Sequence, residues 1–462
     1  MALVMLVGAE ELLPAARRAL AHRVAVGQAE GRAPSLTGAV VRGGRQLWCG
    51  ARAMAEADEP AGDTQYRIGS LTKMFVAVLV MRLRDEGRLD LADPLDRHLD
   101  AGEAEGVTVA QLLAHTAGLA AEARGPWWER TPGDVRPALA DIFGERPRPH
   151  PAGRRFHYSN PGYALLGALI GRLRGHSWSE ALRQEVLEPL GMARTTLLPQ
   201  PPYARGFAVH PWADVIQPEP AEDTGLMAPA GQLWSTADDL SRFGAFLTDG
   251  DDRVLTAATL AEMRGPASPP ADDAAGYGLG MQLLRSEGRL LYGHTGSMPG
   301  FVATLLVSEQ AGAAAVALAN TTSGPDVVAV AADLIKILEA HQPRFPDRWR
   351  PQAGVDLALL SLTGLWYWGP RPVILRLLPD GGLELSSPGQ QGPSYRFRAE
   401  PDGTWTGLDS YYAGEKLRVT READGAATHI DLGTFIFTRE PYDPASPPAG
   451  QPHPDGWQAG RP

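Results

Sequence analysis

The stretch Ser70-Leu71-Thr72-Lys73 is followed at once by the almost wholly apolar run Met74-Phe-Val-Ala-Val-Leu-Val-Met-Arg-Leu83. A helix that is apolar all round lies in the interior of a protein, so this run predicts a buried helix. Residues three apart share one face of a helix, and Ser70 and Lys73 are therefore expected side by side. A lysine at the start of a buried helix needs a partner or a lowered pKa. Both outcomes suit a nucleophilic serine next to its base.

Lysine is rare in this chain, which makes its position after Ser70 informative. It occurs only at Lys73, Lys336 and Lys416, and nearly every other basic residue is arginine. Arginine stays protonated at any working pH, whereas a buried lysine can lose its proton and act as a base. A Ser-x-x-Lys pattern alone is usually an ordinary helix surface. The apolar residues that follow it here favour the catalytic interpretation.

The composition excludes several classes of function. At 462 residues the chain is long enough for two or three domains. Its net charge is −11 and it has no basic block, which argues against a nucleic-acid partner and against anionic membrane surfaces. The single cysteine, Cys49, excludes an internal disulfide, and the eleven histidines are scattered without zinc spacing. We therefore predict no metal and no other cofactor.

The N-terminus predicts neither export nor a membrane anchor. Residues 1–11 lack a basic region, and their apolar run is short. No later stretch reaches the roughly 18 consecutive apolar residues that a membrane-spanning helix needs. The sequence as given therefore predicts a soluble cytoplasmic protein without a membrane partner, unless the true start lies upstream.

The order of the expected elements over residues 10–340 indicates one discontinuous α/β domain, in which N-terminal strands precede a helical middle, further strands and a last helix. Residues 120–150 are rich in Pro, Arg and Trp and are expected to form an irregular insertion. Helices are expected at 10–30, from Ser70 onward, near 108–115, and at 162–174, 178–188 and 325–340, and strands in a hairpin over 36–54 and at 278–285, 290–293, 301–308 and 314–319.

The character of the chain changes after residue 340. Residues 341–356 are rich in Pro and Arg and predict a linker. Short aromatic and aliphatic runs separated by turn residues follow, and their spacing is typical of a small antiparallel β-barrel over 357–440. The last residues, 441–462, are rich in Pro and Gly and are expected to be disordered. The expected strands lie near 363–369, 372–378, 382–387, 394–399, 404–408, 415–420, 428–432 and 434–438.

Two further motifs follow the Ser70 stretch in the chain. Tyr158-Ser159-Asn160 lies in a Pro/Gly-containing segment ahead of an apolar helix, and His294-Thr295-Gly296 lies between two strand-like runs. Each alone is weak, because Tyr158 fits a core tyrosine and His294 fits a turn residue. In the order Ser-x-x-Lys, Tyr-x-Asn, His-Thr-Gly the three are specific, since penicillin-recognising enzymes carry a related ordered triplet.

This ordered set resembles the serine β-lactamase and penicillin-binding-protein superfamily, and its Tyr-x-Asn form is similar to the class C lactamase, DD-peptidase, D-aminopeptidase and esterase branch. The resemblance implies an antiparallel sheet flanked by helices, together with an all-helical lobe. The segment after the linker is similar to the lipocalin-like barrels attached to some of these hydrolases. Supporting strings occur at Leu112–Leu119, Leu187–Met192 and Pro229–Leu240.

The resemblance implies a role for each motif residue. Ser70 would attack a carbonyl, and Lys73 would accept or relay its proton. Tyr158 would face Ser70 and shuttle the proton to the leaving group and later from the acyl acceptor. To act as a phenolate it would need a pKa well below ~10, which the ammonium of Lys73 is expected to cause. Asn160 would hold the Lys73 amine or a substrate amide.

The third motif would form one side of the substrate site, again by resemblance. The backbone N–H groups of Ser70 and Ser297 would make the oxyanion hole, with Thr295 and Gly296 beside them. His294 stands where lactamases keep a lysine, and an imidazole holds a substrate carboxylate less firmly than an ammonium does. No acidic deacylating residue of the class A kind is identifiable, so class A lactamase activity is disfavoured.

Several acyl transfers share this apparatus. Without an export signal, a cytoplasmic hydrolase or transferase is favoured, acting on peptide-type amides, esters or thioesters with a D-residue on the acyl side, as a D-peptidase or DD-peptidase-like enzyme. The alternatives are a penicillin-binding-protein-type thioesterase that cyclises peptidyl thioesters from a carrier protein, an esterase or β-lactamase, and a non-catalytic acyl-binding sensor. The cleft would be lined by Trp127, Trp128 and the barrel, which would exclude water from it. The barrel itself is expected to be a structural cap or a ligand-binding module.

Overall fold

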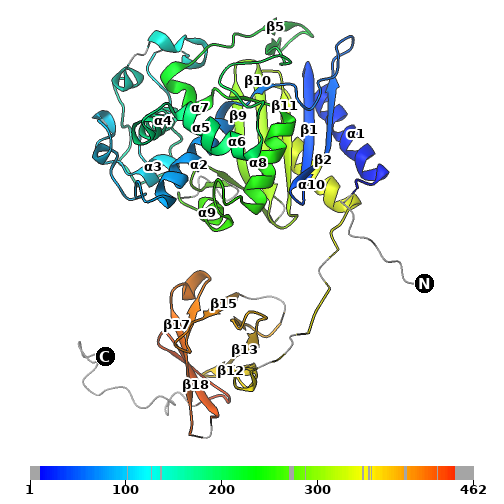
Figure 1. Cartoon of the computed structure of the whole chain (residues 1–462). Helices are drawn as coiled ribbons and strands as arrows, with labels where there is room; N and C mark the ends of the chain where they lie inside the picture. The colour runs from blue at the N-terminus through cyan, green and yellow to red at the C-terminus, as the bar shows by residue number, and fades with distance from the viewer. Residues whose placement is uncertain are drawn as a thin grey trace. The chain divides into compact units, whose positions relative to one another are not determined.

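In a computed structural model, seven antiparallel strands form the central sheet of the first of two compact units, in the order β2-β1-β11-β10-β9-β8-β7 (Figure 1). The units divide between Phe345 and Pro346. The strands are β1 (Ser35–Arg42), β2 (Arg45–Ala53), β7 (Ala275–Tyr277), β8 (Gln282–Ser286), β9 (Arg289–Met298), β10 (Phe301–Ser308) and β11 (Ala313–Ala319). The structure describes residues 11–442 except 101, 126, 136–137, 270–274, 287, 346–347, 352–353, 355, 390–392 and 424.

Strand β11 shows how the sheet is covered on both faces. Successive side chains of a strand point to opposite faces. Ala314, Val316 and Leu318 belong to the core that includes α8 (Ala237–Asp249), while the alternate alanines belong to the core that includes α1 (Pro14–Glu30) and α10 (Val327–His341). Figure 1 shows α1 and α10 near the β1–β2 edge and α8 over the sheet. The small side chains of β11 allow helices to pack closely on either side.

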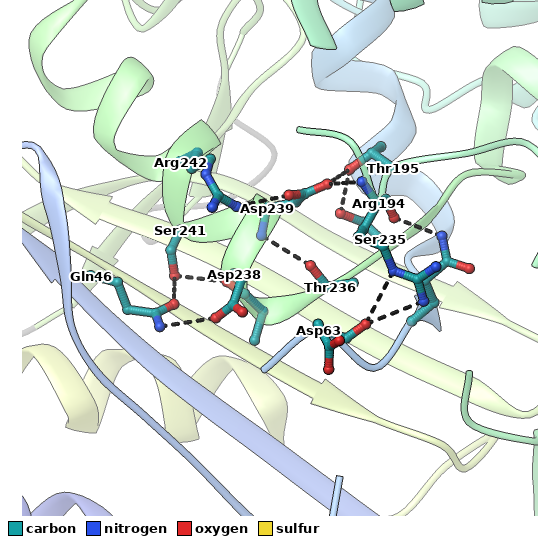
Figure 2. Close-up of polar contacts among 12 residues, drawn as sticks. Gln46, Asp63, Arg194, Thr195, Ser235, Thr236, Asp238, Asp239, Ser241 and Arg242 are labelled. Carbon is teal, nitrogen blue, oxygen red and sulfur yellow. Dashed lines mark hydrogen bonds and ion pairs between the residues drawn. The ribbon is translucent and has the colours of Figure 1, made fainter. Parts of the chain in front are cut away.

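A polar network fixes the start of α8 (Figure 2). Thr236 caps the helix, because its Oγ1 accepts a hydrogen bond of 3.0 Å from the Asp239 N–H. The Asp239 carboxylate in turn accepts from the Arg194 N–H at 2.8 Å. Gln46 on β2 donates from Nε2 to Asp238 at 3.0 Å. These bonds hold α8 against both the hairpin and the segment around Arg194, so the network has a structural role.

Helices that come in the chain after β2 and before β7 form the lobe that carries the Ser70 stretch. Helix α2 buries almost its whole surface, and Phe75 stacks on Phe243 of α8 with ring centroids 3.9 Å apart. The lobe contains α2 (Thr72–Asp85), α3 (Val109–Leu113), α4 (Asn160–Arg174), α5 (Trp178–Leu182), α6 (Glu188–Leu190), α7 (Ala228–Gly231) and α9 (Ala257–Met263). Two small ribbons add β3 (Tyr66–Arg67) with β6 (Trp234–Ser235) and β4 (Phe207–Val209) with β5 (Ile216–Pro218).

Three expected elements differ in detail from those observed. The helix expected at 178–188 is α5, followed by a π-helical turn (Arg183–Leu187) and then α6. The strand expected at 278–285 begins only at Gln282, because residues 278–281 form the turn between β7 and β8, where the Gly278 N–H donates to the Met281 carbonyl. The strand expected at 290–293 runs on to Met298, so His294 lies within a strand and its interpretation as a turn residue is wrong.

The second unit is a closed barrel of eight antiparallel strands, so the expected fold class is confirmed for both units. Its core includes Trp366 and Phe397, and the Trp366 indole N–H donates to the Leu362 carbonyl at 2.7 Å. After α11 (Leu357–Leu360) come β12 (Gly364–Trp368), β13 (Arg371–Leu377), β14 (Leu383–Ser386), β15 (Ser394–Ala399), β16 (Trp405–Gly407), β17 (Lys416–Arg421), β18 (Ala427–Leu432) and β19 (Phe435–Thr438). The tail expected to be disordered lies, beyond residue 442, outside the described residues.

Candidate active site

Ser70 lies in a tight turn between β3 and α2. The turn is the 3₁₀ segment η1 (Gly69–Leu71), and Gly69 adopts a φ of 54°, which favours glycine. A Cβ on Gly69 would lie 2.6 Å from the Ser297 nitrogen, so the turn packs directly against β9. The Thr72 hydroxyl donates to the Gly69 carbonyl at 2.7 Å and fixes the turn from within. Ser70 is thereby presented at the start of a buried helix.

Lys73 is fully buried and has three polar neighbours. Its Nζ lies 3.0 Å from Ser70 Oγ, 2.7 Å from Asn160 Oδ1 and 2.6 Å from the Ala230 carbonyl. The expected pairing of Ser70 with Lys73 is therefore present. Burial lowers the pKa of Lys73 to about 7, although the charges of Glu122 and Glu129 act in the opposite direction. A neutral amine has two protons for the two carbonyl-type oxygens, which leaves its lone pair for the Ser70 hydroxyl.

Tyr158 lies in the loop before α4 and lines the same cavity as Ser70. Its ring lies 4.8 Å from Lys73 Nζ, and the ring of the buried His115 stacks at 4.1 Å. Burial raises the pKa of Tyr158 above its ordinary value, so the expectation of a phenolate with a lowered pKa is wrong. The physical reason is that a phenolate loses its hydration here, while Lys73 itself loses charge near neutral pH. Because burial lowers the pKa of Lys73 and raises that of Tyr158, Lys73 is the better candidate for the base.

Asn160 is the first residue of α4 and faces Lys73 as expected. Its Nδ2 donates to both carboxylate oxygens of Glu122, at 3.1 and 2.9 Å. Glu122 also accepts from the Trp128 indole N–H at 2.6 Å. With Nδ2 held by the carboxylate, Oδ1 must point toward the amine of Lys73. Glu122 thus orients Asn160. The sequence carries no signal for this role, because Glu122 lies in an insertion without periodicity.

The His-Thr-Gly motif forms one edge of the site on β9. Ser70, Tyr158, Thr295, Gly296 and Ser297 line a cavity of about 530 Å³ together with His294. A Cβ on Gly296 would lie 1.9 Å from the Ile68 carbonyl oxygen, so only glycine allows the strand to pack this closely on the Ser70 turn. The structure therefore brings together every residue predicted for the site.

His294 is buried and contributes no positive charge at neutral pH. Its Nε2 lies 3.0 Å from the Tyr277 hydroxyl, and its Nδ1 contacts the Thr295 carbonyl. Burial lowers the pKa of His294 to about 3, and the charge of Lys73 acts in the same direction. The neutral imidazole therefore cannot replace the lysine that lactamases keep at this position.

No group of three or more His, Cys, Asp or Glu side chains that could hold a metal occurs within the described ranges. The same ranges contain no helix long and apolar enough to cross a bilayer.

Comparison with known proteins gives matches over both units. Residues 17–340 match the family model described as Beta-lactamase, and residues 355–439 match a domain of unknown function, DUF7586. Penicillin-binding protein 4 of Amycolatopsis lactamdurans is 31% identical over 331 residues, which cover 65% of this chain and 84% of the relative.

Two solved structures resemble this one at about the same sequence identity. The crystal structure of SurE is 26% identical with a TM-score of 0.59 and covers 92% of this chain and 99% of its own. The D-amino acid amidase from Ochrobactrum anthropi SV3, complexed with D-phenylalanine, is 25% identical with a TM-score of 0.61. That match covers 71% of this chain and 99% of the amidase.

Proposed function

Since the chain belongs to the Beta-lactamase family, we propose that it is a serine hydrolase or acyltransferase that forms an acyl-enzyme on Ser70. The observation that carries this proposal is the distance of 3.0 Å between Lys73 Nζ and Ser70 Oγ, in a buried site where Asn160 and Ala230 occupy the other two directions of the amine. A nucleophile within hydrogen-bond reach of an oriented base is the arrangement that covalent catalysis requires.

In the proposed mechanism, Ser70 Oγ adds to the carbonyl carbon while its proton passes to Lys73 Nζ. The oxyanion that forms accepts hydrogen bonds from the backbone N–H groups of Ser70 and Ser297. The bond to the leaving group then breaks, and the leaving group takes a proton from the Lys73 ammonium through the Tyr158 hydroxyl. Water or an amine next attacks the acyl ester and gives its proton back along the same route, which restores the Ser70 hydroxyl.

We propose peptide-type amides, esters or thioesters with a D-residue on the acyl side as substrates. Support comes from the neighbours, because the similar amidase was solved with D-phenylalanine and SurE with D-Leu. The proposed compartment is the cytoplasm, which only the sequence analysis supports.

Cyclisation of a peptidyl thioester is the second candidate. The match to SurE extends over 92% of this chain, and therefore over residues of both units, whereas the amidase match covers 71%. This extent supports an enzyme in which catalytic unit and barrel occur together, as expected for the barrel-bearing members of the superfamily. The two candidates differ only in whether water or the amine of the substrate accepts the acyl group.

A pair of peptidyl thioester mimics that differ only in the configuration of the acyl residue tests the proposal. The D form is expected to react faster, with linear acid indicating a hydrolase and cyclic product a cyclase, as separated by mass. The Ser70→Ala variant is the control and should release neither product. Equal rates for the D and L forms, together with fast cleavage of simple short-chain esters, would instead identify an esterase.

A further inference from the structure

The cavity beside Ser70 has an acidic lining. Among the described residues that line it, Glu129 and Asp326 are acidic, and none is lysine or arginine. The one histidine of the lining, His294, is neutral at physiological pH because burial lowers its pKa to about 3. A substrate carboxylate placed in this cavity would therefore meet like charge and no counter-ion.

Three cations, Arg130, Arg67 and Lys73, act on the charge of Glu129, but none of them lines the cavity. Lys73 donates toward Ser70, Asn160 and Ala230 as described above. Arg130 pairs with Glu219 at 2.6 Å, and its guanidinium stacks on the Trp127 ring at 3.8 Å. Arg67 is 1% exposed and donates to the Glu222 carbonyl at 2.9 Å, so it does not reach the cavity surface. None of these cations is placed to bind a substrate carboxylate.

The two acidic residues differ in what they can offer a ligand. The Asp326 carboxylate accepts from the Ala329 N–H at 2.9 Å and caps α10, whose N-terminal dipole partly compensates its charge. Glu129 belongs to the short 3₁₀ segment Trp128–Arg130 and is half-buried. Within the part of the chain that the structure describes, its carboxylate has no hydrogen-bond partner and no ion-pair partner within 4 Å. Burial and the charge of Glu122 raise its pKa, while the charges of Arg130, Arg67 and Lys73 act in the opposite direction. Glu129 is thus a carboxylate at the cavity wall with free acceptor capacity.

We infer that Glu129 determines specificity by binding a protonated amine of the substrate, so that the preferred acyl donors carry an ammonium group near the scissile carbonyl and no carboxylate. An ammonium can form the charge-assisted hydrogen bond that Glu129 lacks. Like-charge contacts at the same place reject an anionic substrate. Because Glu129 would bind the substrate beside Ser70, this inference rests on the proposed function, in which Ser70 is the nucleophile.

The proposed role of Glu129 is tested with the full-length protein and three thioesters of D-phenylalanine. Their amino group is free, N-acetylated or N-succinylated. The wild type is expected to have the highest kcat/KM for the free amine and the lowest for the succinyl substrate. Glu129→Gln should lower kcat/KM for the free amine relative to the N-acetyl substrate by about tenfold to a hundredfold, the range of one hydrogen bond to a charged group. Because the charge of Glu129 also raises the pKa of Lys73, any effect through Lys73 is expected to fall equally on both substrates. Glu129→Arg should raise turnover of the succinyl substrate.

The matched control is Asp134→Asn, because Asp134 is an exposed acidic residue of the same insertion that does not line the cavity. It should leave all three substrates unchanged. An equal loss on the free-amine and N-acetyl substrates in Glu129→Gln, or a wild-type preference for the succinyl substrate, overturns the role of Glu129 while leaving the proposed function intact. If Ser70→Ala still turns over the N-acetyl substrate, the proposed function itself fails.

Discussion

Lys73 is the residue on which the proposed chemistry depends, because its surroundings favour a neutral amine. Its head group is removed from water, and burial lowers its pKa to about 7. Its three neighbours also match both protonation states. As an ammonium it can donate to all three, and as an amine it can donate to Asn160 and Ala230 and accept from Ser70.

Replacing Lys73 by arginine is expected to be as damaging as replacing it by alanine. Arginine keeps the charge but cannot accept a proton, so each variant should lose on the order of 10²–10⁴ in kcat, the usual range for a general base. Steady-state turnover of an activated ester measures the loss, and intact mass shows whether any acyl-enzyme still forms. Near-normal turnover by Lys73→Arg would reduce Lys73 to an electrostatic partner.

Glu122→Gln is expected to shift the pH profile of kcat/KM. The negative charge of Glu122 raises the pKa of Lys73, so its removal should lower that pKa and move the acidic limb of the profile to lower pH. Because glutamine can still accept from Trp128 and Asn160, this variant separates the charge from the orientation of Asn160. Glu122→Ala should also lower kcat, by about tenfold, because Asn160 then loses its fixed orientation. An acidic limb that does not move in Glu122→Gln contradicts this account of Glu122.

At the scale of elements, the fit between β9 and the Ser70 turn decides whether the site assembles. Gly296→Ala is expected to slow probe labelling of Ser70 by about a hundredfold or more, because displacements of about 1 Å at a catalytic centre have effects of that size. Its Cβ would lie 1.9 Å from the Ile68 carbonyl oxygen. The matched control is Gly276→Ala on β7, where the nearest atom would lie 3.8 Å away. Equal labelling rates in the two variants would show that β9 need not pack this closely.

The elements with clear periodicity and the residues of the three motifs, including Tyr158 in its loop, were predictable from the sequence, whereas site residues with neither signal were not. Helix α2 and the barrel strands have the apolar patterns that packing requires, so both were expected where they occur. The strand expected at 290–293 is shorter than β9, because the glycines that let β9 approach the Ser70 turn resemble turn residues in the sequence. Glu122 and Glu129 lie in the irregular insertion, where only tertiary contacts indicate a role.

At the scale of the whole molecule, each unit has a hydrophobic core of its own. Phe397→Ala in the barrel core is therefore expected to destabilise the barrel by about 3–5 kcal/mol, the usual cost of such a truncation. Calorimetry should show one transition moved to lower temperature and another unchanged, with Ser70 labelled at the normal rate before the barrel unfolds. Phe243→Ala should instead move the transition of the first unit. A single transition shifted equally by both variants would show that the units unfold together.

Trapping the acyl-enzyme and locating it in the chain tests most directly whether Ser70 is the nucleophile. The intact protein is treated with a fluorophosphonate or penicillin-type probe, and the adduct is mapped by peptide mass spectrometry. We expect one adduct per chain on Ser70, no labelling of Ser70→Ala, and labelling that weakens as the pH falls below about 7, where Lys73 becomes protonated. An adduct on another residue, or unchanged labelling of Ser70→Ala, would contradict this expectation.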